Sequence, residues 1–97
     1  MKPEDFGCTV VRHNSKGVDA RQTFIPAGLM LDQHIHEFPH LSIVGSGTAR
    51  LIVGDTSRFL NGGDCVEIKA GVQHSVMAVT DVIWFCIWPD SIEVLES

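Results

Sequence analysis

The sequence contains no tyrosine, few basic residues and no long apolar run. The lack of tyrosine excludes any mechanism that needs a phenol from this chain. Seven lysine and arginine residues in a chain of net charge -5 argue against binding to nucleic acid or anionic membranes, which requires clustered basic side chains. The longest apolar run, residues 82–88, is far shorter than the roughly 20 residues of a membrane-spanning helix. We therefore expect a small-molecule partner, with no nucleic acid and no membrane.

Cysteine is scarce, and the three cysteines lack the Cys-x-x-Cys spacing of a zinc or redox motif. They are Cys8, Cys65 and Cys86. An odd number cannot pair completely within one chain, so we expect small buried residues in a reducing cytoplasm. Residues 1–6 lack the apolar core of a signal peptide, which also favours a cytoplasmic localisation.

The length of 97 residues predicts a single domain over residues 1–97. No stretch shows sustained helical periodicity, and short apolar or alternating runs are separated by glycine turns, which is typical of an all-β domain. The expected strands are 9–12, 21–25, 30–36, 41–44, 48–53, 64–69, 74–79 and 82–88. Short strands with tight turns favour a sandwich or a closed barrel, and the pattern alone does not choose between them.

The most informative residues of the sequence are its histidines. Four of its five histidines form the candidate metal site, namely His34, His36, His40 and His74. Alternation in a strand points His34 and His36 to one face, and a bend at Pro39 would let the returning strand place His40 opposite them. Four imidazoles facing one small cavity are costly to bury without partners, and a metal ion would satisfy all of them.

The competing interpretation is that these histidines are ordinary surface or hydrogen-bonding residues. A lone histidine is more often one of these, and His13, within the polar run 13–17, is expected to be such a residue. A His-x-His pair also arises by chance on a strand. The glycines that flank the histidines favour the metal site.

In these glycines and histidines the chain resembles the cupins. The first cupin motif is matched by Gly28, His34, His36 and Gly47, with His40 at the position of a glutamate. The second is matched by Gly63, Gly71 and His74, with Lys69 and Ala78 in place of a proline and an asparagine. The resemblance implies a small β-barrel of the jelly-roll or double-stranded β-helix type. It places motif 1 at about residues 28–47 and motif 2 at about 63–78, with a four-histidine metal site and a homodimer.

The ion itself is left open among Mn, Fe, Ni, Cu and Zn. Four neutral imidazoles leave the charge of a divalent ion uncompensated, which favours a strong Lewis acid and an anionic or enolisable oxygen ligand. Tetrahedral zinc would give a closed structural site, octahedral Mn, Fe or Ni would keep two positions open, and imidazole also suits copper.

Strand alternation predicts which side chains line the pocket beside the histidines. The expected pocket residues are Met30, Ser42, Val44, Val76 and Ala78. Asp32 is the candidate catalytic residue, as a general base or as an acceptor for an imidazole N–H, and otherwise lies solvated at the barrel mouth. Arg50 would hold a substrate carboxylate or be an exposed strand arginine. Trp84, Phe85 and Trp88 are expected in the core or a dimer interface.

Two classes of function remain open at this point. The first is a metal-dependent enzyme acting on a small organic molecule, with dioxygenase-like or isomerase, lyase or cyclase chemistry. The second is a small-ligand-binding or sensing module without turnover, which the sparse acid and base groups favour. A purely structural metal site ranks below both, because a glycine-rich β barrel should not need a metal to fold.

Overall fold

The computed structural model describes residues 7–33 and 39–89, and in these ranges the chain forms strands and turns only. The strands are β1 (Thr9–Ser15), β2 (Val18–Ile25), β3 (Met30–Gln33), β4 (His40–Ser46), β5 (Thr48–Val53), β6 (Thr56–Asn61), β7 (Cys65–Ile68), β8 (His74–Ala78) and β9 (Val82–Pro89). None of the described residues belongs to a helix long and apolar enough to cross a membrane. The all-β prediction is confirmed.

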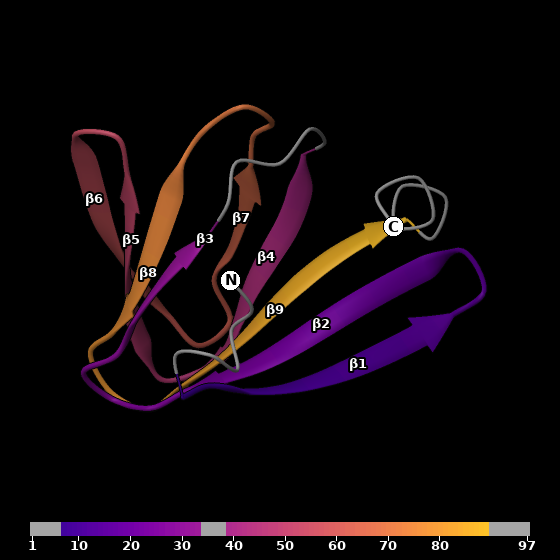
Figure 1. Cartoon of the computed structure of the whole chain (residues 1–97), viewed down its shortest axis with the longest axis horizontal. Helices are drawn as coiled ribbons and strands as arrows, with labels where there is room; N and C mark the ends of the chain where they lie inside the picture. Colours follow the sequence, from indigo (N-terminus) through magenta and orange to yellow (C-terminus); the bar gives the residue numbers. More distant parts are fainter. Residues whose placement is uncertain (1–6, 34–38, 90–97) are drawn as a thin grey trace.

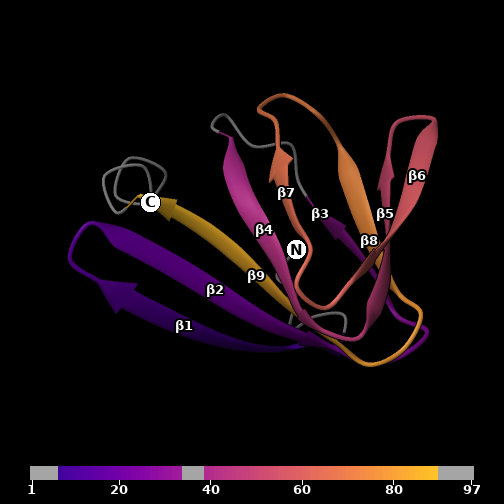
Figure 2. The ribbon, with the colours of Figure 1, turned by 180° about the vertical axis from the view of Figure 1, so that it is seen from behind.

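Two antiparallel sheets face each other. The five-stranded sheet has the order β1-β2-β9-β4-β7, and the four-stranded sheet has the order β3-β8-β5-β6. Figures 1 and 2 show that the sheets converge at the lower edge of the view and diverge toward the upper edge, where β4 and β8 begin. The β1–β2 hairpin extends sideways from this body (Figure 1).

Gly47, in the turn between β4 and β5, shows why one motif position needs glycine. Its φ of 87° is unfavourable for residues with a side chain. A Cβ built there would lie 2.0 Å from the carbonyl oxygen of Asp81. Both constraints hold where the β4–β5 turn passes the segment between β8 and β9, so this glycine lets the two sheets meet.

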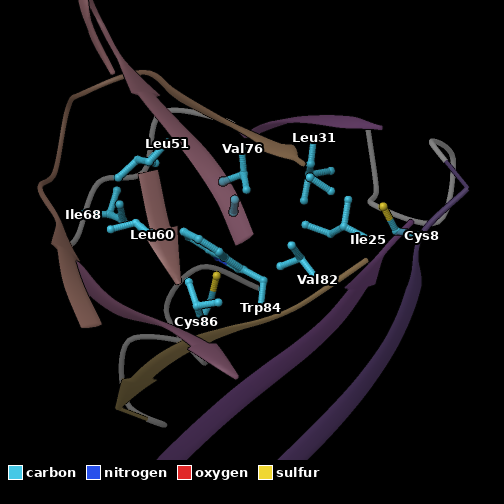
Figure 3. Close-up of a cluster of buried hydrophobic side chains, with 13 residues drawn as sticks. Cys8, Ile25, Leu31, Leu51, Leu60, Ile68, Val76, Val82, Trp84 and Cys86 are labelled. Atoms are coloured by element: carbon cyan, nitrogen blue, oxygen red, sulfur yellow. The ribbon is translucent and has the colours of Figure 1, made fainter. Parts of the chain in front are cut away.

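The hydrophobic core lies between the sheets. Alternate residues of each strand point inward, as the burial of Val82, Trp84 and Cys86 along β9 illustrates. Figure 3 shows the side chains of both sheets converging on the Trp84 indole, which is fully buried. The prediction that Trp84 is a core residue is confirmed.

The cysteines have two different environments. Cys8 and Cys86 are buried, as expected for small apolar residues, and Cys65 is exposed. The expectation of a packing role is wrong for Cys65, because alternation along β7 turns its side chain away from the face that buries Ile68.

Candidate functional site

His40 and His74 lie at the same end of the barrel, one on each sheet. His40 begins β4 and pairs in register with Ile68, the last residue of β7, and the chain then turns back to begin β8 at His74. The ring centroids are 6.1 Å apart with an interplanar angle of 50°. Both residues are buried, with exposed fractions of 7% for His40 and 1% for His74. The structure therefore brings together these two predicted ligands.

Neighbouring groups hold each imidazole. The Nδ1 atom of His74 lies 3.5 Å from the carbonyl oxygen of Val72, a long contact within the turn that precedes β8. The ring of His40 meets the Trp88 ring edge-on, with centroids 5.9 Å apart. Each imidazole is thus in contact with a neighbouring group of the chain.

The two other predicted ligands, His34 and His36, lie outside the described residues. Within residues 7–33 and 39–89, no cluster of three or more histidine, cysteine, aspartate or glutamate side chains could hold a metal. His13 lies on exposed β1, where its Nε2 hydrogen-bonds Gln22 Oε1 at 2.7 Å. It is thus a surface residue away from the pair, as predicted.

Four of the expected pocket residues point into the barrel. Ser42, Val44, Val76 and Ala78 are each at most 1% exposed. Val44, Val76 and Ala78 are part of the hydrophobic core, and the Ser42 hydroxyl lies 3.8 Å from the Cys86 sulfur. Their inward orientation agrees with alternation, and their contact with a ligand stays a prediction.

Met30 and Arg50 lie on the outer face of the four-stranded sheet instead. In register, Met30 pairs with Met77, Met77 with Arg50, and Arg50 with Phe59. Met30 is 43% exposed because its neighbour Leu31 takes the inward position in β3. Arg50 Nη2 donates to Ser57 Oγ at 3.1 Å. The expected inward position of Met30 is therefore corrected, and of the two alternatives for Arg50 the structure agrees with a strand arginine on the outer face.

Asp32 lies in β3, where its backbone pairs with Ser75. The structure describes its strand but not its side chain, so the catalytic role of Asp32 stays a prediction.

Hollows adjoin both histidines. A groove of about 300 Å³ runs over the strand ends beside His40 and Trp88, with apolar walls that include Val18, Leu41 and Ile87. A second hollow of about 210 Å³ adjoins His74 and is lined partly by Val53, Ile68 and Val72. The site is thus accessible to a small molecule and is mostly apolar, as ligand sites usually are.

Arg21 is an inward-facing polar residue that the sequence interpretation missed. It pairs in register with Cys86, and its Nη2 donates to the Cys86 sulfur at 3.7 Å. Its guanidinium carbon lies 5.9 Å from the centre of the Trp88 ring, within the usual range for a cation–π contact. The signal was the alternation of Thr23 and Ile25, both fully buried, which places Arg21 on the same inner face.

Residues 20–88 match the Cupin domain, a span from β2 to β9 that contains both His40 and His74. The chain belongs to the cupin family. No curated protein matches the chain.

Solved structures of cupins share the fold of this cupin domain. An RmlC-like cupin from Shewanella frigidimarina NCIMB 400 is 19% identical with a TM-score of 0.75, over 87% of this chain and 77% of that one. A cupin superfamily protein from Desulfitobacterium hafniense DCB-2 is 14% identical with a TM-score of 0.76, over 84% and 76% of the two chains. These likenesses confirm the prediction of a small jelly-roll barrel.

A larger enzyme contains the same fold. Salicylate 1,2-dioxygenase from Pseudoaminobacter salicylatoxidans is 17% identical with a TM-score of 0.80. The match covers 93% of this chain but 27% of the dioxygenase. At such identity the likeness shows the fold alone.

Proposed function

We propose that this cupin binds one divalent transition metal through histidines and acts on a small organic molecule that coordinates the ion directly. The reaction would be dioxygenase-like or a metal-assisted isomerisation, elimination or cyclisation. The observation that carries the proposal is the buried His40–His74 pair, which joins the two sheets at the accessible end of the barrel. His34 and His36 would complete the four-histidine set.

The two described rings lie near enough to each other to bind one ion. An imidazole bound through nitrogen at about 2.1 Å has its ring centre about 3.2 Å from the ion, so two such rings lie at most about 6.4 Å apart. The observed separation of 6.1 Å is below this limit but above the roughly 5.2 Å of two ligands on a tetrahedral ion, so a bound zinc ion would draw the rings together. Cupins commonly bind a metal, which supports the same proposal.

A divalent ion held there would supply Lewis acidity toward a substrate oxygen. The chain's own residues would then orient the ligand and limit access of water. Trp88 packs against His40 and forms part of the groove wall, and the apolar residues around His74 line the second hollow. Removing water from such a site strengthens electrostatic interactions within it.

The proposal is tested by measuring metal content and oxygen consumption on the same samples. His40→Gln and His74→Gln should each lower the bound metal at least tenfold, since each removes one ligand, while His13→Gln should leave it unchanged. Circular dichroism checks that each variant is folded. Metal-dependent turnover of a substrate would support catalysis, and equal metal content in all three folded variants would contradict the site.

The second candidate is a binding or sensing module without turnover. It is favoured by the apolar character of the inward-facing residues beside the histidines, because the acid and the base that line the same hollow, Glu67 and Lys69, are exposed. A metabolite that copurifies with the protein and is recovered unchanged after prolonged incubation would support this alternative.

We also propose a homodimer formed through the outer face of the five-stranded sheet. Four large apolar residues on that face are exposed, namely Val11 (47%), Val18 (46%), Phe24 (39%) and Leu41 (48%). Exposed apolar patches commonly mark protein interfaces, and a two-fold dimer would use the same patch twice. We further propose that the protein is cytoplasmic.

A further inference from the structure

We propose that Arg21 is an anion-binding residue of the barrel interior and anchors the carboxylate of a planar small molecule beside the histidines. The inference deepens the proposed function, on which it rests for the site at His40 and His74, by naming the substrate class. In this arrangement the ion would take one end of the ligand and Arg21 the other.

Trp88 connects the arginine with the histidine pair. The Arg21 guanidinium carbon lies 5.9 Å from the centre of the Trp88 ring, and the His40 ring centroid is also 5.9 Å from that ring. The register of β2 with β9 places Arg21 next to Cys86, a fully buried residue on the inner face. Figure 3 shows Cys86 pointing into the space between the sheets. Trp88 is therefore the residue that links the guanidinium to the proposed metal site.

The guanidinium has more donors than the protein satisfies. Its Nη2 donates to a thiol sulfur, which is a weak acceptor, and its Nε is buried with no hydrogen-bond partner among the described residues. Asp19, an acid on the same face of β2, instead accepts from Asn14 Nδ2 at 2.5 Å. A buried charged donor without a partner is costly, and a carboxylate would satisfy Nε and Nη2 as a forked pair.

The surroundings of Arg21 add further donors and positive charge. Thr23 Oγ1 and Trp84 Nε1 are also buried without a hydrogen-bond partner in the part of the chain that the structure describes, and these two residues pair in register between β2 and β9. Arg12 lies directly opposite Arg21 on β1. Like charges in this position repel each other, and an anion between them would remove the repulsion. The local positive charge contrasts with the chain's net charge of -5.

The shape of the site favours a flat carboxylate over a phosphate. The planar guanidinium fork matches a planar carboxylate, and the Trp88 ring offers a flat apolar surface to the body of an aromatic or conjugated acid. Arg50 provides the comparison, because its Nε is also buried with no hydrogen-bond partner within residues 7–33 and 39–89, yet it lies on the outer face with Nη2 bonded to Ser57 Oγ. An unpaired Nε alone therefore does not indicate a ligand. Arg21 is assigned this role because it also points inward.

The test is calorimetric titration of wild type, Arg21→Gln and Arg50→Gln with benzoate, benzamide and inorganic phosphate. Each protein is titrated with and without metal, and its metal content is measured. Arg21→Gln should bind benzoate about 10- to 100-fold more weakly than wild type, because it loses charge-assisted hydrogen bonds, and should keep its metal. Arg50→Gln, which removes the same charge, should match wild type. Benzamide and phosphate should bind wild type more weakly than benzoate.

Unchanged benzoate affinity in Arg21→Gln would overturn the assignment, as would a wild type that does not bind benzoate or prefers phosphate. If Arg21→Gln does not fold, Arg21→Lys replaces it. It keeps the charge but loses the fork, so it should bind several-fold more weakly, and equal affinity would overturn the assignment. A wild type that takes up no metal would contradict the proposed function, while its benzoate titration would still decide the role of Arg21.

Discussion

His40 and His74 lie on opposite sheets, and their imidazole rings are 6.1 Å apart. This proximity follows from the topology, because β4 pairs with β7 and the chain after β7 turns directly into β8. The pair therefore depends on the approach of the two sheets. A substitution that separates the sheets should weaken the site even when it lies far from either histidine.

Metal removal should leave the barrel folded. Among the described residues the core between the sheets is mainly apolar, so its burial does not depend on an ion. Treatment with a chelator should lower the melting temperature by a few degrees, through loss of binding free energy, and leave the circular dichroism spectrum unchanged. A chain that unfolds upon chelation would instead indicate a structural metal site.

Gly47→Ala should destabilise the fold by about 3 kcal/mol or more, because it combines a strained φ with a backbone clash. Gly28→Ala is the matched control, since both glycines have a φ of 87° but a Cβ at Gly28 meets nothing within 4 Å. Urea unfolding of both variants would measure the difference. Equal losses of unfolding free energy would show that the contact with Asp81 is unimportant.

Leu60→Ala should cost about 2–5 kcal/mol of unfolding free energy, because Leu60 is 1% exposed and its truncation leaves a cavity. Phe59 is adjacent in β6 but 63% exposed, so Phe59→Ala should change stability by less than about 0.5 kcal/mol. Thermal or chemical denaturation compares them. A larger loss of stability in Phe59→Ala than in Leu60→Ala would mean that Phe59, and not Leu60, points into the core.

The strand that contains Leu60 shows where pattern reasoning was insufficient. β6 was not among the predicted strands; it has a single buried side chain and lies at the edge of its sheet. Its polar sequence offers no alternation to detect. Short buried runs such as Val82–Trp88 were predicted because they consist almost entirely of apolar residues.

The candidate site was predictable only in part. The motif spacing anticipated the meeting of His40 and His74, since glycine turns and ligands agree in register. The sequence did not show which residues of β3 point inward. Met30 and Leu31 are both apolar, so either could have been the buried residue. Arg21 was missed because a charged residue within a strand is usually solvated, although it shares the parity of Thr23 and Ile25, and the register of β2 with β9 shows its inward position.

Leu41→Asp should weaken the proposed dimer at least tenfold, because it places a charge within the apolar outer face of the five-stranded sheet. Phe59→Asp is the control, as Phe59 is exposed on the outer face of the other sheet. Sedimentation velocity over a range of concentrations would measure both. If Phe59→Asp dissociated the dimer and Leu41→Asp had no effect, the interface would lie on the four-stranded sheet and the proposal would be contradicted.

The most direct test of the metal site is a metal-edge X-ray absorption spectrum of the loaded protein. We expect imidazole ligands at about 2.0–2.1 Å if the ion is zinc, and we expect His40→Gln and His74→Gln each to remove one imidazole from the spectrum. A spectrum that is the same in wild type and both variants would contradict the claim that these two residues bind one ion.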